Sequence, residues 1–200
     1  MNGLSDQITA VILAGGRNSR FNGKDKAFFP VNGVPMVEII SGRLRDLFKK
    51  ILVVTNSPGS YAGYTDLPFV CDTYSGTGPL GGIHAAMANV KTPYIFVVSC
   101  DMPYIDTGLI SKQADLFFRK KKADVLIPRI NSSIEPLHAI YSSKLAGRLG
   151  EFLTSTSDYS IRAFLRGLDV AYMDLPADTS VIRVFTNINS PQDLPCSTGE

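Results

Sequence analysis

Short apolar runs alternate along the chain with segments in which apolar residues recur at helical spacing. The apolar runs predict strands at 10–13, 51–55, 69–72, 94–99, 123–128, 135–141 and 170–175. The helical spacing predicts helices at 36–48, 80–87, 109–118, 145–152 and 159–165. Because strands alternate with helices, we predict a three-layer α/β/α fold in which helices cover both faces of a mostly parallel sheet. The run at 135–141 is expected to be antiparallel.

The length of the chain suits one domain with a sizeable core. Two hundred residues, of which 44% are hydrophobic and 19% charged, have the composition of an ordinary globular protein. Since no internal repeat or linker divides the sequence, we expect a single domain over residues 1–200. Its core is expected to span 8–194, and residues 195–200 are expected to form a frayed tail.

Charge and composition exclude several classes of function. A net charge of +2 argues against a large nucleic-acid-binding surface, so we expect no nucleic-acid partner. No apolar run is long enough to cross a membrane, and the polar residues 1–7 do not form a secretory signal. Cys71, Cys100 and Cys196 are odd in number and lack metal-ligand spacing, which favours the reducing cytoplasm. Cys71 and Cys100 are expected to be small buried side chains at strand ends.

A glycine pair and a group of cations follow the first predicted strand. Gly15 and Gly16 remove two side chains, and four cations follow within eleven residues, at Arg17, Arg20, Lys24 and Lys26. Free backbone N–H groups beside cations suit a polyanion, although a glycine turn with a solvated basic loop is the simpler alternative. The spacing matches neither the Walker loop nor the dinucleotide fingerprint.

Polar side chains also end three of the predicted strands. Asn56 follows the second strand, and Asp72 and Asp101 follow later ones. Ligands of open α/β sheets lie outside the carboxyl ends of the strands, so these residues are expected to converge on one site. A turn-forming Asn is an equally good interpretation of Asn56. Asp101 precedes Met-Pro and is placed to hold a hard cation, whereas Asp106 is expected to cap the next helix.

Two further segments carry candidate binding residues. Residues 76–82 include four glycines, so the backbone there can approach a flat ligand closely. A flexible linker is the alternative, but a helical pattern follows directly. Asn187 and Asn189 lie in the segment 185–194 that closes the domain, where turn and cap chemistry is the alternative to a binding role.

Several of these motifs together resemble the molybdenum cofactor guanylyltransferases. They are Leu-Ala-Gly-Gly with Arg20, Gly23 and Asp25-Lys26, Gly-Pro-Leu-Gly-Gly at 78–82, Cys-Asp-Met-Pro at 100–103, and Phe-Thr-Asn-Ile-Asn-Ser-Pro at 185–191. Ser190 replaces the usual threonine. The resemblance covers nearly all of residues 8–194 and is thin from 110 to 180.

The resemblance implies a Rossmann-like nucleotidyltransferase fold and a reaction. GMP passes from GTP to molybdopterin or Mo-molybdopterin, pyrophosphate leaves, and the guanine dinucleotide form of the cofactor results. Arg20, Lys26 and Asp101 are implied to be catalytic, with Mg²⁺ on Asp101. The implied nucleotide-binding residues are Leu13, Ala14, Gly15, Gly16, Lys26, Asn56, Asp72, Gly78, Pro79, Leu80, Gly81 and Asp101, and the implied pterin-binding residues are Arg162, Asn187 and Asn189.

Other functions remain open at this point. The chain could be a cytidylyl- or sugar-activating transferase, or a catalytically silent nucleotide-binding subunit. The joint presence of Arg20, Lys26 and Asp101 argues against a silent subunit. Transient contact with proteins that deliver or accept the cofactor is a further expectation.

Overall fold

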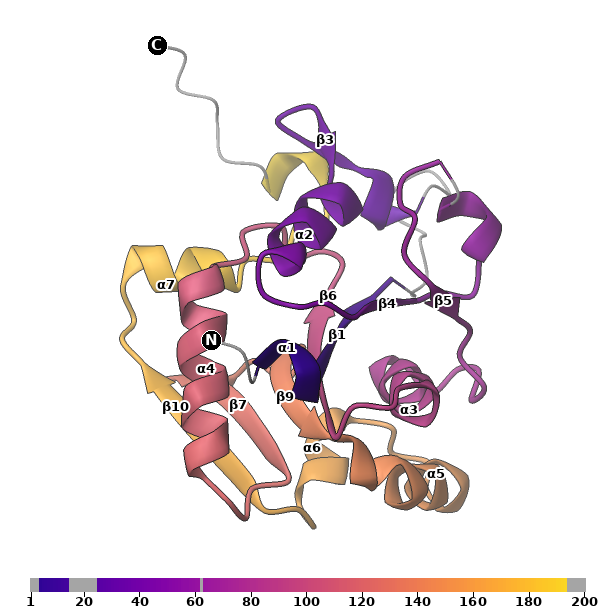
Figure 1. Ribbon diagram of the computed structural model, residues 1–200, viewed down its shortest axis with the longest axis vertical. Helices are drawn as coiled ribbons and strands as arrows, with labels where there is room; N and C mark the ends of the chain where they lie inside the picture. Colours follow the sequence, from indigo (N-terminus) through magenta and orange to yellow (C-terminus); the bar gives the residue numbers. More distant parts are fainter. Residues whose placement is uncertain (1–3, 15–24, 62, 194–200) are drawn as a thin grey trace.

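A computed structural model of the protein describes residues 4–14, 25–61 and 63–193, and one large sheet organises them (Figure 1). The strands of this sheet are β1 (Ile8–Leu13), β4 (Ile51–Val54), β5 (Phe69–Val70), β6 (Tyr94–Ser99), β7 (Val125–Ile130), β8 (Ser133–Ile134), β9 (His138–Ser142) and β10 (Val170–Leu175). Their order is β10-β7-β9-β6-β1-β4-β5, and β8 pairs with β7. A separate hairpin joins β2 (Pro30–Val31) to β3 (Val34–Pro35).

Most strands of the sheet run in the same direction. β1 is parallel to β4 and to β6, β4 is parallel to β5, and β10 is parallel to β7. β9 is antiparallel to both of its neighbours, β6 and β7, and β8 is antiparallel to β7. The prediction of a mostly parallel sheet with an antiparallel strand after residue 135 is therefore confirmed.

Helices lie on both faces of the sheet. They are α1 (Leu4–Gln7), α2 (Met36–Arg45), α3 (Pro79–Asn89), α4 (Thr107–Arg119), α5 (Ala146–Ser155), α6 (Ile161–Leu165) and α7 (Thr179–Val184), with the short 3₁₀ helices η1 (Lys26–Phe28), η2 (Pro58–Tyr61), η3 (Ser143–Leu145) and η4 (Pro191–Asp193).

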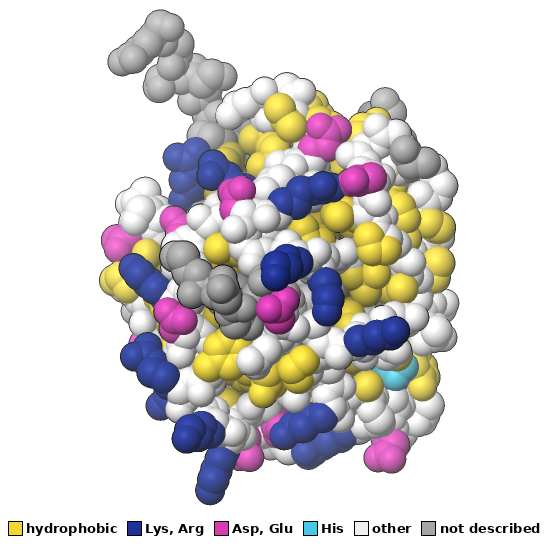
Figure 2. Space-filling model, in the orientation of Figure 1, with side chains coloured by type: hydrophobic (Ala, Val, Ile, Leu, Met, Phe, Trp, Pro, Cys, Tyr) yellow, Lys and Arg dark blue, Asp and Glu magenta, His cyan; other side chains and the backbone are white. Residues whose placement is uncertain are grey.

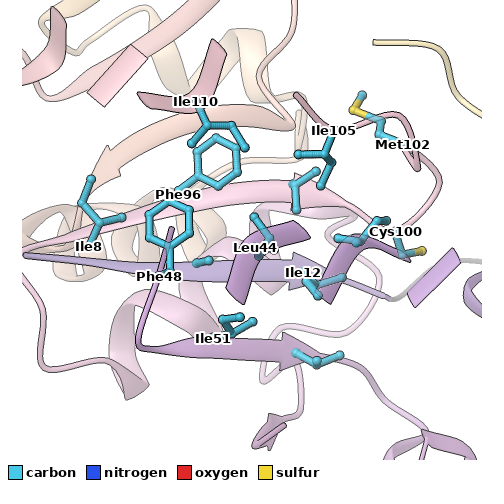
Figure 3. Close-up of a cluster of buried hydrophobic side chains, with 14 of the residues drawn as sticks. Ile8, Ile12, Leu44, Phe48, Ile51, Phe96, Cys100, Met102, Ile105 and Ile110 are labelled. Carbon is cyan, nitrogen blue, oxygen red and sulfur yellow. The ribbon is translucent and has the colours of Figure 1, made fainter. Parts of the chain in front are cut away.

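The alternation of strand side chains divides the core into two layers. Ala10 and Ile12 of β1 pack in the cluster that includes α2 and α4, whereas Val11 and Leu13 pack with α3, α5 and α6. Figure 3 shows the first cluster, in which the rings of Phe48 and Phe96 stack with centroids 5.7 Å apart. The three-layer α/β/α fold is confirmed.

Three local features bear on the predictions from sequence. Asp106 caps α4 through its side chain, as expected. Helix α7, which Asp178 caps through its side chain, was not predicted. Cys100 is buried, but Cys71 is exposed, so the expectation for Cys71 was wrong: it follows β5, a two-residue strand at the edge of the sheet.

The surface has no dominant charge on the face drawn in Figure 2, where Lys and Arg are interspersed with Asp and Glu. Within the described part of the chain, no helix has both the length and the apolar character that a membrane span requires.

A histidine is buried in the core beside two aromatic rings. His138 is fully buried, with Phe96 and Phe185 at 5.0 and 5.1 Å between ring centroids. Neither of its ring nitrogens has a hydrogen-bond partner among the described residues. Burial lowers the pKa of His138 to about 4, and its backbone hydrogen bond and Asp106 oppose this shift only in part. The imidazole is therefore neutral in the folded protein near pH 7.

This burial predicts a loss of stability in mild acid. An unfolded histidine has a pKa of about 6.5, so between pH 6.5 and 4 the unfolded state binds the additional proton and stability falls as the pH falls. At pH 5 the loss should be about 2 kcal/mol. His138→Leu should remove this loss, which urea unfolding at pH 7 and pH 5 would measure. His84→Leu, at the less buried of the two histidines, should retain most of it. If wild type and His138→Leu lost the same free energy of unfolding between pH 7 and pH 5, the loss would not come from His138.

Candidate nucleotidyl-transfer site

The main cavity opens at the carboxyl ends of β1, β4, β5 and β6. Its volume is about 790 Å³, a size that suits a small-molecule ligand. The described residues that line it are Leu13, Val54, Thr55, Asn56, Asp72, Gly76, Gly78, Pro79, Gly82, Ser99, Asp101 and Leu137. Because these four strands are parallel, their ends meet at one edge of the sheet and bring together residues from distant parts of the chain.

Six of the sequence-predicted nucleotide-binding residues line this cavity: Leu13, Asn56, Asp72, Gly78, Pro79 and Asp101. Three others lie behind its wall. Ala14 and Leu80 are buried, and the Leu80 side chain belongs to the core cluster around α3. Gly81 is also buried, directly against Asp72. Gly15, Gly16 and Arg20 lie outside the described residues.

Asn56 and Asp72 form a connected pair at the ends of β4 and β5. The Asn56 Oδ1 atom accepts a hydrogen bond from the Asp72 N–H at 3.0 Å, and the Asp72 Oδ1 atom accepts one from the Tyr74 N–H at 2.7 Å. Burial raises the pKa of Asp72, and the Tyr74 N–H and His84 oppose that rise. The Asn56 amide nitrogen has no protein partner among the described residues, so it is free to donate to a ligand.

The glycine-rich segment is shaped by backbone conformations that favour glycine. Gly76 has φ +84°, and Gly78, which precedes α3, has φ +64° and ψ −148°, a region that only glycine commonly adopts. At Gly81, a Cβ atom would lie 2.5 Å from both Asp72 carboxylate oxygens and from the Thr77 hydroxyl. The segment can therefore pack directly on the Asp72 carboxylate. Since α3 begins at Pro79, its positive N-terminal end also faces the cavity.

A lysine, a carboxylate and a carboxamide meet beside the cavity. The Lys26 Nζ atom lies 3.2 Å from Asp101 Oδ2 and donates a hydrogen bond to Asn189 Oδ1 at 2.7 Å. Lys26 begins η1, which the Asp25 side chain caps by accepting from the Ala27 N–H. The side chains of Lys26 and Asp101 are only 22% and 16% exposed, so water screens their interaction only in part. We call these three residues the Lys26 cluster.

The carboxy-terminal segment reaches the Lys26 cluster through its backbone. The Ile188 N–H donates to the carbonyl oxygen of Asp101 at 2.8 Å. The N–H groups of Asn189 and Ser190 donate to Asp193 Oδ2 at 2.7 and 2.8 Å. These bonds place the Asn189 carboxamide on Lys26, so a residue predicted for the pterin contacts a residue predicted for the nucleotide.

The other two pterin candidates lie in different surroundings. Asn187 is exposed, two residues from Asn189 on the same segment. Arg162 is exposed on α6, whose buried residues Phe164 and Leu165 pack in the core cluster of α3 and α5. Neither residue lines the main cavity. A pterin role for Arg162 and Asn187 stays a prediction.

The surroundings of Asp101 suit a hard cation that takes few ligands from the protein and the rest from water or phosphate. Asp101 Oδ1 is buried and has no hydrogen-bond partner among the described residues. No three His, Cys, Asp or Glu side chains within those residues group closely enough to hold a metal ion alone. Mg²⁺ typically takes one or two protein carboxylates and completes its shell with waters and phosphates. One free carboxylate oxygen beside a cavity fits that mode of binding.

Several lining residues were not identified from the sequence. Thr55 and Ser99 stand at or directly after the ends of β4 and β6, so the strand-end rule that selected Asn56 and Asp101 would also have found them. Leu137 precedes the antiparallel strand β9 and reaches the cavity because its carbonyl accepts from the Ser99 N–H. No signal in the sequence marks Leu137.

Comparison with known proteins bears directly on this geometry. The family model of the MobA-like NTP transferase domain matches residues 10–173. A crystal structure of molybdopterin-guanine dinucleotide biosynthesis protein A from Archaeoglobus fulgidus has a similar fold, with a TM-score of 0.77 and 24% sequence identity. The alignment covers 92% of this chain and 94% of that one.

Curated relatives match over nearly the same length. A probable molybdenum cofactor guanylyltransferase of Clostridium perfringens is 32% identical over 186 residues, which cover 91% of each chain. Another from Peptoclostridium acidaminophilum is 35% identical, covering 93% of this chain and 86% of the relative. The molybdenum cofactor guanylyltransferase of Vibrio parahaemolyticus is 30% identical, covering 94% and 93%. With the strand-end cavity and the Lys26 cluster, these matches establish that the chain belongs to the family of MobA-like NTP transferases.

Proposed function

We propose that this chain transfers GMP from GTP to the terminal phosphate of molybdopterin or Mo-molybdopterin, releasing pyrophosphate and forming a guanine dinucleotide. The names of its relatives support this reaction. The structural observation that carries the proposal is the Lys26 cluster at the carboxyl end of β6, beside a cavity that also holds Asn56 and Asp72.

The reaction needs charge stabilisation more than proton transfer. The attacking phosphate is already ionised, so no strong general base is required. Two polyanions must meet in line, which a fixed cation in a partly buried site makes less unfavourable. The Lys26 ammonium can bind the triphosphate and stabilise the charge that develops on pyrophosphate. Arg20 is proposed to assist from the neighbouring segment.

Asp101 is proposed to hold a divalent cation, which we assign as Mg²⁺. The free Oδ1 atom of Asp101 supports this assignment. A bound Mg²⁺ would neutralise phosphate oxygens as a Lewis acid. In the structure, Lys26 neutralises the Oδ2 atom of the same carboxylate. Asp101 would therefore hold the cation, while the Lys26 ammonium beside it would bind the phosphates directly.

Guanine is proposed to bind against Asp72 and the backbone of residues 76–82. Guanine offers N–H donors at N1 and N2, which adenine lacks. A carboxylate and carbonyl oxygens are suitable acceptors, and they would be left unpaired against adenine. Sites built in this way can reject the wrong analogue by about 10⁴-fold. Asn56, whose amide nitrogen has no partner among the described residues, is proposed to donate to the nucleotide from the end of the neighbouring strand β4.

The acceptor is proposed to bind on the side of the carboxy-terminal segment. Asn189 and Asn187 would contact the pterin there, and Arg162 remains a more distant candidate. Because the product is a cofactor for other enzymes, we also propose transient contacts with proteins that deliver or accept it. The cytoplasm is the proposed location, a setting in which the buried Cys100 thiol would stay reduced.

Replacing the proposed metal ligand should stop turnover without unfolding the protein. Asp101→Asn keeps the size of the side chain but removes the charge that holds a hard cation, so pyrophosphate release should fall by about 10²-fold or more. Binding of Mn²⁺, followed by electron paramagnetic resonance in the presence of GTP, should weaken in parallel. Asp115→Asn, at an exposed position on α4, is the control and should behave as wild type. Near-wild-type turnover of Asp101→Asn at limiting Mg²⁺ would refute the assignment.

A methyl group at Gly81 should disturb the proposed guanine site. In Gly81→Ala the new Cβ meets the Asp72 carboxylate and Thr77, so we expect GTP to bind at least about 10-fold more weakly and the protein to lose about 1–3 kcal/mol of stability. Calorimetric titration with GTP and with ATP would measure affinity and discrimination. Gly147→Ala in α5 is the matched control, because no atom lies within 4 Å of its Cβ position. Equal GTP affinity in both variants would exclude the placement of guanine beside Gly81 and Asp72.

The two carboxy-terminal asparagines should differ in their effects. Asn189→Ala removes the acceptor of a 2.7 Å bond from Lys26, so turnover should fall about 10-fold or more even when molybdopterin is saturating. Asn187→Ala should raise only the KM for molybdopterin, because Asn187 is exposed and does not contact Lys26. Steady-state kinetics with each substrate varied would separate the two. If both variants changed turnover and the KM for molybdopterin in the same way, Asn189 would have no role separate from that of Asn187.

A further inference from the structure

Tyr61, which lies outside the cavity, contacts both residues that flank the segment 15–24. It ends η2 and is fully buried. Its hydroxyl group lies 2.6 Å from Asp25 Oδ2 and 3.1 Å from the carbonyl oxygen of Ala14. Ala14 directly follows β1 and is the last residue described before this segment, and Asp25 is the first described after it. One side chain therefore links the chain on both sides of the basic segment.

The two residues linked by Tyr61 are held in different ways. The Ala14 N–H donates to the Val54 carbonyl at 2.9 Å, so Ala14 is fixed to the sheet at the end of β4. Asp25 belongs to no strand, and its carboxylate accepts from Tyr61 through one oxygen and from the Ala27 N–H through the other. The single proton of the Tyr61 hydroxyl is shared between the Asp25 carboxylate, the nearer acceptor, and the Ala14 carbonyl, so this group ties the start of η1 to the sheet.

Tyr61 also contacts the last residue of η1. Its ring lies 4.6 Å from the ring of Phe28 and 5.7 Å from that of Phe69 in β5. Lys26 therefore lies in a three-residue helix that Tyr61 contacts at both ends, through its hydroxyl at the cap and through its ring at Phe28. No atom of Tyr61 is among those lining the cavity.

The hydroxyl group stays a donor under physiological conditions. Burial raises the pKa of Tyr61, and the neighbouring Asp25 carboxylate raises it further. A neutral phenol at 2.6 Å from a carboxylate makes a short, charge-assisted hydrogen bond, which is stronger than one between neutral groups. This bond limits where η1, and with it the backbone of Lys26, can lie.

We propose that Tyr61 is a positioning residue for the transfer reaction: it holds Asp25 and η1 so that the Lys26 ammonium lies beside Asp101 and Asn189. The role rests on the proposed function, since the kinetic effect passes through Lys26. It is separate from the binding residues, because Tyr61 would touch neither substrate.

The test is a kinetic cycle between Tyr61→Phe and Lys26→Ala. Tyr61→Phe keeps the ring and removes only the hydroxyl, so kcat/KM for GTP should fall by about 10- to 100-fold, the effect of one hydrogen bond to a charged group. Lys26→Ala should lower kcat/KM for GTP by about 10²- to 10³-fold. In the Lys26→Ala background, adding Tyr61→Phe should change kcat/KM for GTP less than two-fold, because the group that Tyr61 positions is absent.

Tyr64→Phe is the matched control. The ring of Tyr64 stacks on the same Phe28 ring at 4.3 Å, and its hydroxyl group has no hydrogen bond among the described residues. Its kinetics should stay within two-fold of wild type. Wild-type kinetics for Tyr61→Phe, or losses that multiply independently in the double variant, would overturn the positioning role.

A second readout does not depend on turnover. The Ala27 amide bonds to the carboxylate that Tyr61 holds, so Tyr61→Phe should speed its hydrogen exchange, measured by NMR, by about 10-fold. If the wild-type chain consumed no GTP, the proposed function would fail, and this exchange rate would still decide whether Tyr61 holds η1. Unchanged exchange would overturn the proposal.

Discussion

The interaction on which the site depends is the contact between Lys26 and Asp101. The two residues are 75 positions apart, and each is held by its own backbone neighbours. Asp101 follows β6 in a turn fixed by the Cys100 N–H, which donates to Leu13, and by the Met102 N–H, which donates to Ser99. A partly buried ammonium group and a carboxylate stabilise each other only if both stay in place, so the rigidity of the sheet edge is what makes the pair effective.

A second constraint comes from the way the glycine-rich segment meets Asp72. The Asp72 carboxylate is partly buried, and burial raises its pKa. Gly81 provides that burial by bringing backbone instead of a side chain against the carboxylate. The Tyr74 N–H donates to Asp72 Oδ1, which opposes the rise in the pKa of Asp72. Burial and hydrogen bonding thus act in opposite directions on the pKa of Asp72. Asp72 follows β5, which β1 and β4 separate from β6 and Asp101.

Much of the fold could be predicted because it follows from local periodicity. The bounds predicted for β6 and β10 agree with the structure, and so does the cap at Asp106. The convergence of Asn56, Asp72 and Asp101 on one cavity followed from a single rule about parallel strands. What the sequence could not reveal were contacts between distant segments. Asn189 and Lys26 are 163 residues apart, and Tyr61 lies in a short 3₁₀ helix without apolar periodicity. Such contacts depend on tertiary packing, which a local pattern does not encode.

The hydrogen bond from Ile188 to Asp101 has a consequence for the order in which the protein matures. β1, η1 and β6 are synthesised early, and β1 and β6 can pair before the end of the chain is made, but Asn189 follows Lys26 by 163 residues. Until residues 185–193 have been synthesised and have folded back onto the end of β6, Lys26 lacks its second partner, the Asn189 carboxamide. A nascent chain can therefore bring Lys26 to Asp101 before it completes the Lys26 cluster, which needs residues 185–193 as well.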